Sequence, residues 1–177
     1  IALPFACAVT GVLLWALNQA YPKVGCDYRY FLPRLLDSHL HYLRNGPAIQ
    51  WWTPSFGGGL PSFPNPQQMQ FSLPQLWLLI VDPWPAINLT TAVMSLACFF
   101  ACYALFTRLF GHHRGEASFV ATLFGVSAFY MEHMRLGHIS FHAFPLLPVI
   151  LLVLLSQRLP AVAKILLVAF ALTYLNY

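Results

Sequence analysis

The stretch WPAINLTTAVMSLACFFACYALFTRLF, which runs from Trp84 to Phe110, decides the fold of this chain. Its only charged residue, Arg108, lies close to its C-terminal end. A helix that crosses a lipid bilayer needs about 20 consecutive, mostly apolar residues. The stretch exceeds that length, so the sequence predicts a membrane-spanning helix here.

Four further apolar stretches approach the same length. They are Ile1–Ala20, Ala117–Met131, Ile139–Leu155 and Ala161–Tyr177. Hydrophobic residues make up 59% of the chain and charged residues 8%, whereas an ordinary soluble domain carries about 25% charged residues. This composition excludes a conventional soluble domain and a disordered chain, and the scattered Lys and Arg argue against nucleic-acid binding. The sequence therefore predicts an all-α, polytopic transmembrane helix bundle with about five spans.

Both ends of the chain lie within apolar runs, and the first residue is Ile1 rather than Met. We therefore interpret residues 1–177 as a single transmembrane domain that is a fragment of a longer membrane protein. Basic residues cluster in two short connections, at 108–114 and 158–164, which two spans separate. The positive-inside rule places both connections in the cytoplasm. The long segment 21–83 and the turn 132–138 are then expected on the outer, extracytoplasmic side.

The extracytoplasmic segment contains one amphipathic helix, expected at Phe31–Asn45. Pro33 suits its first turn, and Gly46 followed by Pro47 provides a stop. The apolar positions that share one helical face are Leu32, Leu35, Leu36, Leu40 and Leu43. The opposite, solvated face carries Arg34, Asp37, His41 and Arg44. Such a helix lies either in the membrane interface, with its apolar side down, or against the rest of the protein.

A loop from Trp51 to Pro61 follows, and it combines paired tryptophans with three consecutive glycines. Trp52 is of the residue type that favours the headgroup level of a bilayer, and Gly58 permits close approach of another group. The loop could therefore hold a ligand or a lipid headgroup, and a purely structural re-entrant loop is the alternative. A short apolar helix is expected after the loop, at Leu73–Val81.

Asp27 lies just before the expected amphipathic helix, near the outer membrane surface. A carboxylate at such a place can act as a general base toward a bound hydroxyl, or it can hold a divalent cation. Arg29 follows two residues later and would oppose a rise in the pKa of Asp27. The simpler alternative is that Asp27 only caps the helix.

A second polar cluster, residues 132–142, marks the outer end of the third expected span. It contains Glu132, Arg135, His138 and His142. Arg135 could pair with a phosphate, and His138 and His142 would share a face if their segment were helical. Ionisable groups near membrane spans are costly and often functional, although polar residues at a membrane boundary can simply be solvated. Because this cluster and Asp27 lie on the same expected side, we predict a joint site.

Taken together, these motifs resemble those of the bacterial YfhO-like proteins and, more distantly, of the GT-C superfamily of integral membrane glycosyltransferases. The residues that carry the resemblance are Asp27–Pro33, Trp52–Pro54, Gly57–Pro61, Asn65–Gln67 and Arg135–His138. The resemblance implies transfer of a sugar from a polyprenyl-phosphate carrier to an acceptor at the outer face of the bacterial plasma membrane.

The resemblance also implies that Asp27 is the catalytic base, and that Glu132, with Arg135 and His138, is the nearest match to a second polar motif. Some members of the superfamily require a divalent cation and others do not. This chain lacks a paired Asp-x-Asp motif, so the cofactor stays open.

The predicted site comprises two catalytic and six substrate-binding residues, and no residue is assigned to a metal. The catalytic candidates are Asp27 and Glu132, and the substrate-binding candidates are Arg29, Trp52, Gly58, Arg135, His138 and His142. The expected partners are the polyprenyl-phosphate-linked sugar and membrane lipid. The alternative function is a transporter or lipid flippase without glycosyl transfer. Transporters place charged groups near the bilayer midplane, where these spans have few.

Overall fold

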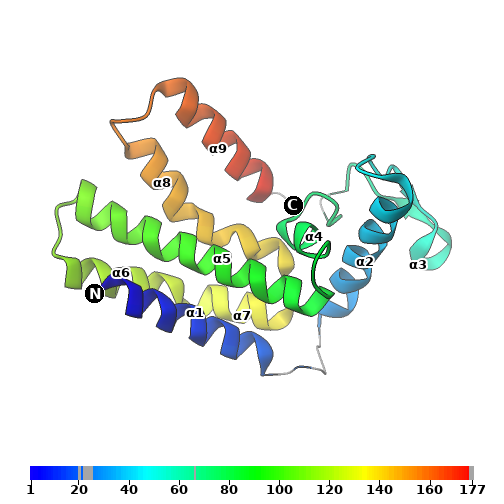
Figure 1. Ribbon diagram of the computed structural model, residues 1–177, viewed down its shortest axis with the longest axis horizontal. Coiled ribbons are helices and arrows are strands. Elements are labelled where there is room, and N and C mark those ends of the chain that lie inside the picture. Colours follow the sequence, from blue (N-terminus) through cyan, green and yellow to red (C-terminus); the bar gives the residue numbers. More distant parts are fainter. Residues whose placement is uncertain (20, 22–25, 66, 176–177) are drawn as a thin grey trace.

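The computed structural model describes residues 1–19, 21, 26–65 and 67–175 (Figure 1). Within these ranges the chain is built of helices, with one short pairing of two-residue strands. The expected all-α class is confirmed. Ala20 and Tyr177, at the ends of the first and fifth expected spans, and Pro66 lie outside the described residues.

Helix α5 (Pro83–Ala104) continues as the π-helical segment η1 (Leu105–Leu109) and forms the axis of the structure. Asp82 is its N-cap, and Pro83 begins its first turn, where a missing amide proton costs no intrahelical bond. The combined helix spans 27 residues and, among the described residues, is the one helix long and apolar enough to cross a membrane. It coincides with the span expected at Trp84–Phe110.

Helix α1 (Ala2–Asn18) packs along α5 (Figure 1). At the end of α1, the Asn18 side chain donates a hydrogen bond to Oδ1 of Asn88, at 2.6 Å, and accepts one from Nε1 of Trp84, at 2.7 Å. Such side-chain bonds between apolar helices fix how one helix is aligned along the other.

The prediction of a single helix at Ala117–Met131 is wrong. The structure divides this region into α6 (Arg114–Gly125) and α7 (Ala128–Leu136). Val126 leaves the helical conformation, and Ser127 takes the N-cap position of α7 with ψ of 136°. A β-branched residue followed by serine is unfavourable inside a helix, and serine favours the N-cap. The local sequence therefore supplies the break.

The stretch expected at Ile139–Leu155 is helical along its length but is not a uniform α-helix. The first half is a 3-10 helix, η2 (Ile139–Leu146), and α8 (Leu147–Leu155) continues from it. Pro145 and Pro148 have no amide proton, so they remove backbone bonds that would join the two halves into one α-helix.

Helix α9 (Ala161–Leu175) runs beside α8 and covers the described part of the fifth expected span. The basic connections between helices lie toward one end of α5 (Figure 1). The α8–α9 connection, with Arg158, and the basic turn 110–114 lie toward the C-terminal end of α5. Helices α2 and α4 lie at its N-terminal end.

Helix α2 covers Tyr28–Asn45 and is longer than the expected Phe31–Asn45. Pro33 consequently lies inside the helix, whereas the sequence predicts it in the first turn. The prediction that Arg34 lies on a solvated face is wrong, whereas the exposed leucines leave the expected position of the helix in the membrane interface as a prediction. The exposed leucines are Leu36, Leu40 and Leu43, and the buried polar side chains are Arg34 and Ser38. Polar contacts with the following loop therefore decide which side of α2 is covered.

The loop after α2 folds into a small hairpin. Strand β1 (Trp52–Thr53) pairs antiparallel with β2 (Leu60–Pro61), and Trp52 lies opposite Pro61. The turn α3 (Ser55–Gly58) connects the two strands. Phe56 has a positive φ of 63° in this turn, a conformation that the following glycines adopt at little cost.

Helix α4 (Leu73–Trp77) lies between the hairpin and α5, and it ends earlier than the expected Leu73–Val81. Residues 78–81 form turns instead, with amide protons of Ile80 and Val81 both bonded to the carbonyl oxygen of Trp77. These turns lead the chain into the extended Asp82, which is the N-cap of α5.

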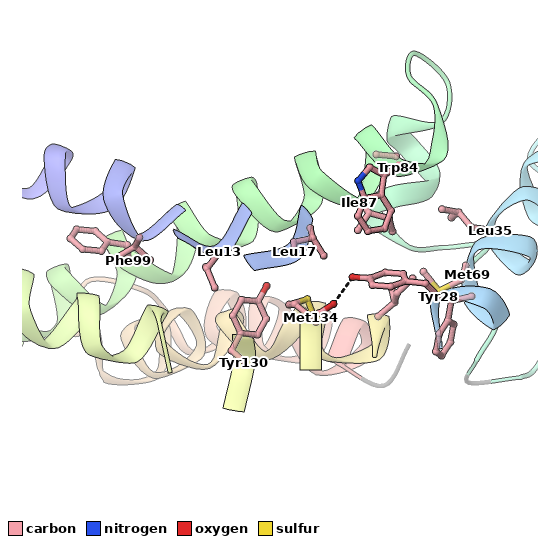
Figure 2. Packing of buried hydrophobic residues seen from close by; sticks show 14 of the residues in the cluster. Leu13, Leu17, Tyr28, Leu35, Met69, Trp84, Ile87, Phe99, Tyr130 and Met134 are labelled. Carbon is pink, nitrogen blue, oxygen red and sulfur yellow. Dashed lines mark hydrogen bonds between the residues drawn. The ribbon is translucent and has the colours of Figure 1, made fainter. Parts of the chain in front are cut away.

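One apolar core joins the bundle to the beginning of α2 (Figure 2). Most of its members come from α1, α2, α5 and α7, and they include Leu13, Leu17, Tyr28, Leu35, Ile87, Phe99, Tyr130 and Met134. The first turns of α2 are therefore held by the same core as the bundle helices, and this fixes the position of the polar residues on either side of Tyr28.

Candidate functional site

The beginning of α2 is fastened to the end of α7 (Figure 2). The Tyr28 hydroxyl donates a hydrogen bond to the carbonyl oxygen of Met134, at 2.6 Å, and the Asp27 amide donates one to the carbonyl oxygen of Leu136, at 3.1 Å. Burial raises the pKa of Tyr28, so its hydroxyl keeps the proton that it donates. These bonds connect two segments that lie more than a hundred residues apart in the sequence.

Gly137 makes this close approach possible. It ends α7 in the left-handed conformation, with φ of 84°. A Cβ atom at this position would lie 2.5 Å from the Tyr28 backbone nitrogen, closer than real contacts allow. Glycine is the residue that meets both demands, and it directs the next residue, His138, toward Asp27.

Asp27 and His138 form the polar centre of this junction. Nε2 of His138 lies 3.2 Å from Oδ2 of Asp27. The Asp27 side chain is 53% exposed and the His138 side chain 32% exposed, so the pair faces solvent without being fully solvated. Asp27 occupies the N-cap position of α2, but its carboxylate makes no capping bond to the helix. The carboxylate is therefore oriented by the histidine and stays accessible to a ligand.

Aromatic contacts hold the His138 ring. It packs edge-to-face against His133, with the ring centres 5.0 Å apart, and His133 in turn lies 4.1 Å from Phe141. The Nδ1 atom of His133 lies 2.8 Å from the carbonyl oxygen of Phe129. His133 belongs to the polar cluster that the sequence shows, but our interpretation gave it no role.

Glu132 and Arg135 bind each other beside this pair. Nε and Nη2 of Arg135 donate to the two carboxylate oxygens of Glu132, at 2.9 and 2.8 Å, on the exposed surface of α7. The hydrogen bond from Arg135 lowers the pKa of Glu132, and the hydrogen bond to Glu132 raises the pKa of Arg135.

His142 lies apart from the accessible part of the site. It is 3% exposed, and neither ring nitrogen has a hydrogen-bond partner among the described residues. The expectation that His138 and His142 share a helical face is wrong, because η2 is a 3-10 helix with three residues per turn. Spacing by four residues therefore turns the two side chains to different sides.

The remaining predicted residues lie on α2 and on the hairpin. Arg29 is exposed in the first turn of α2, two residues after Asp27. Trp52 and Gly58 belong to the hairpin, in β1 and α3, and both are exposed. No described contact joins either residue to Asp27 or His138, so the predicted residues form two separate groups.

Two residues of α2 that the sequence interpretation placed on a solvated face have specific surroundings. Asp37 accepts hydrogen bonds from Thr53, Ser55 and Gln50. Arg34 is 4% exposed, with its guanidinium 4.2 Å from the Tyr30 ring centre. The sequence does contain a signal for this arrangement, the polar residues of the loop. Buried polar groups need hydrogen-bond partners, and these residues could have been expected to find them on α2.

The described residues contain no group of three or more His, Cys, Asp and Glu side chains placed to hold a metal ion. Whether the protein uses a divalent cation therefore remains as open as it is from the sequence. What the Asp27–His138 pair can do chemically is accept a proton from a hydroxyl group, since it presents an oriented carboxylate at an accessible surface.

We compared the chain with known protein families, with curated proteins and with solved structures. None of the three comparisons finds a match.

Proposed function

We propose that the protein is a membrane glycosyltransferase that moves a sugar from a polyprenyl-phosphate carrier to an acceptor hydroxyl at the outer membrane face. The observation that carries this proposal is the Asp27–His138 pair, with 3.2 Å between Nε2 and Oδ2. A glycosyl transfer with inversion needs one base at the acceptor hydroxyl, and a half-exposed, oriented carboxylate is suited to that task.

The proposed reaction uses Asp27 as the base. The acceptor oxygen attacks the anomeric carbon, the bond from that carbon to the phosphate oxygen breaks, and the hydroxyl proton passes to the Asp27 carboxylate. His138 is a positioning residue, because it acts on the reaction through the orientation of Asp27. The departing electron pair stays on the carrier phosphate.

The departing phosphate needs a positive charge close by. Arg29 is exposed two residues after Asp27, and Arg135 has two of its nitrogen atoms bonded to Glu132. We therefore assign the phosphate contact first to Arg29, and to Arg135 through its remaining Nη1 donor. Glu132 is the weaker candidate base, because Arg135 holds it in the ionised form and occupies both of its oxygen atoms.

The proposal includes a multi-pass arrangement of about five spans with the α2 end outside. Its support is the long apolar helix at Pro83–Leu109, together with the shorter apolar helices at Ala2–Asn18, Phe141–Leu155 and Ala161–Leu172. The basic turns gather toward one end of α5, and the beginning of α2, which Asp27 directly precedes, lies at the other end (Figure 1). This separation fits the positive-inside rule with the pair on the outer side.

The test is sugar transfer in membranes that contain the full-length protein. Labelled polyprenyl-phosphate sugars serve as donors, and the lipid and polymer products are identified by mass spectrometry. The wild type is compared with Asp27→Asn and with the matched control Asp82→Asn. Asp82 is an exposed acid at the same end of the bundle, at the N-cap of α5, and has no side-chain capping bond.

We expect Asp27→Asn to lower transfer by about 100-fold or more, the usual contribution of a general base, and Asp82→Asn to leave it unchanged. Equal transfer by the wild type and Asp27→Asn at matched expression would exclude Asp27 as the base. Substrate-dependent flux in proteoliposomes without any product would instead establish the transporter or flippase alternative.

A further inference from the structure

A cleft of about 400 Å³ lies between the second half of α2 and the hairpin, away from the Asp27–His138 pair. The side chains that define it are Asp37, His41, Arg44, Gln50, Trp52 and Ser55, and we call it the Trp52 cleft. Sites for small organic ligands have volumes of about 300–1,000 Å³ and a few convergent polar groups. The Trp52 cleft falls in this range of volumes, and its lining brings several polar groups together beside one aromatic ring.

The Asp37 carboxylate is fixed in one orientation. Its Oδ1 atom accepts hydrogen bonds from the hydroxyls of Thr53, at 2.9 Å, and Ser55, at 2.8 Å. Its Oδ2 atom accepts one from Nε2 of Gln50, at 2.9 Å. A carboxylate has about four acceptor positions, so these three bonds leave room for a ligand hydroxyl.

A second layer of buried amides supports this carboxylate. Gln50 is 4% exposed, and its Oε1 atom accepts a hydrogen bond from Gln68, at 3.1 Å. Gln68 also donates to the buried Ser38 hydroxyl of α2, at 2.7 Å. A network of this kind holds its members rigidly when the buried polar groups are paired. Functional sites are usually supported in this way, because a rigid site loses less entropy when it binds.

Trp52 supplies an aromatic ring beside these polar groups. Its ring lies so close to Gly59 that a Cβ atom there would be 2.7 Å from Cζ2, which fixes the ring. The residue nevertheless stays 57% exposed. Trp52 therefore packs on Gly59 of its own hairpin, and the rest of its ring stays exposed next to an oriented carboxylate and amide.

These features fit a saccharide better than other small ligands. A sugar ring has one face of C–H groups, which are attracted to the electron-rich face of an aromatic ring, and a rim of hydroxyls. Carboxylate, amide and guanidinium groups are planar donors and acceptors that can bind adjacent hydroxyls. Asp37 and Arg44 contribute opposite charges to the lining, so the cleft has no strong preference for an anion or a cation.

We propose that the Trp52 cleft binds a neutral saccharide, with Trp52 against one face of a sugar ring and Asp37 accepting bonds from its hydroxyls. Asp37 lies ten residues beyond Asp27 on α2, which corresponds to about 15 Å along the helix axis. The cleft is therefore a binding subsite and not the reaction centre. The distance between Asp27 and the cleft suits an acceptor chain of several sugars that lies along α2, and this part of the inference rests on the proposed function.

The experiment measures saccharide binding to the full-length protein in nanodiscs by saturation-transfer NMR and calorimetry. The probes are neutral trisaccharides of glucose, galactose, mannose and N-acetylglucosamine, titrated into the millimolar range, and inorganic phosphate. The variants are Trp52→Ala, Trp52→Phe and the matched control Trp51→Ala. Trp51 is 63% exposed, packs edge-to-face against Phe63 and does not line the cleft.

We expect at least one trisaccharide to bind, Trp52→Ala to weaken it about tenfold or more, and Trp52→Phe to keep part of the affinity. Trp51→Ala is expected to bind as the wild type does, and thermal unfolding of each variant establishes that it is folded. The proposal is overturned if no trisaccharide binds, if only phosphate binds, or if Trp51→Ala and Trp52→Ala weaken binding equally.

Binding to the Asp27→Asn protein separates this inference from the proposed function. If the wild type and Asp27→Asn both bind the saccharide but neither shows any transfer, the result supports the cleft and contradicts the proposed glycosyltransferase. If the wild type transfers sugar and Trp52→Ala binds the saccharide as tightly as the wild type, the result supports the glycosyltransferase and contradicts the cleft.

Discussion

The hydroxyl of Tyr28 donates a hydrogen bond to the carbonyl oxygen of Met134, 2.6 Å away and 106 residues later in the sequence. Both residues are buried, and the bond lies directly between the bundle and the first turn of α2 (Figure 2). It holds Asp27 on one side of the junction and His138 on the other, at the distance at which their side chains meet.

Removing this hydroxyl should destabilise the junction. Tyr28→Phe leaves the Met134 carbonyl with only the longer bond from the Gly137 amide, at 3.2 Å, and the expected loss in the free energy of unfolding is about 1 kcal/mol. The matched control is Tyr30→Phe, which removes an exposed bond to Gln67 and should cost less. Thermal unfolding of both variants in detergent measures the difference. Equal effects of the two substitutions would show that the buried bond is not important.

Gly137→Ala should disturb the site more than an ordinary substitution of a left-handed glycine. Its Cβ would meet the Tyr28 backbone, whereas Gly111 has a similar φ of 71° and open space around it. Gly111→Ala is therefore the control, with an expected cost of about 1 kcal/mol from the backbone conformation alone. Gly137→Ala should cost clearly more and should also lower transfer, measured in the same membranes. A cost equal to that of Gly111→Ala would contradict the close approach.

The contact between α1 and α6 offers a third prediction. A Cβ atom at Gly125 would lie 2.7 Å from Cγ1 of Val9, so Gly125→Ala should destabilise the packing by about 1–3 kcal/mol. Val9→Ala in the same protein should recover part of the loss, because it removes the opposing methyl groups. Gly115→Ala, in the same helix but with no atom within 4 Å, is the control. Thermal unfolding that shows no recovery in the double variant would exclude this contact as the cause.

The beginning of α6 should stabilise the fold in a pH-dependent way. Glu116 has a lowered pKa because His112 and the His113 amide bond to its carboxylate. A lowered folded-state pKa gives stability that is present above the ordinary Glu pKa of about 4.3 and is lost as the pH falls through the folded value.

Glu116→Gln should therefore lower the melting temperature by about 2 °C near neutral pH and make no difference in acid in which the folded protein carries a protonated Glu116. Differential scanning fluorimetry of the two proteins across this range measures the difference. The same melting-temperature difference at both ends of the range would contradict a role for the carboxylate charge.

The sequence predicts the helices well where apolar length alone decides them. The span expected at Trp84–Phe110 and the helix at Pro83–Leu109 coincide, because length and composition are the properties that define such a helix. The two interrupted regions were missed for physical reasons that the same sequence contains. Ser127 and the pair Pro145 and Pro148 interrupt hydrogen bonding within runs whose apolar composition is continuous.

The candidate site could be predicted in part. Asp27 and His138 belong to polar clusters that stand out in an apolar chain, and the proposed arrangement of about five spans would put them on one side of the membrane. Their direct contact depends on Gly137 and Tyr28. These two residues act through contacts between distant parts of the chain, and such contacts produce no periodic pattern in the sequence. The surroundings of Asp37 were missed, because helical spacing assigns it to a solvated face while its partners Thr53 and Ser55 come from a loop.

The central claim is that Asp27 and His138 act as one unit in sugar transfer, and a double-mutant cycle tests it most directly. Transfer rates are measured for the wild type, Asp27→Asn, His138→Ala and the double variant, at matched expression and melting temperature. We predict that Asp27→Asn lowers the rate about 100-fold or more, that His138→Ala lowers it less, and that the double variant is no slower than Asp27→Asn. Losses that simply multiply in the double variant, or a wild-type rate in His138→Ala, would contradict the claim.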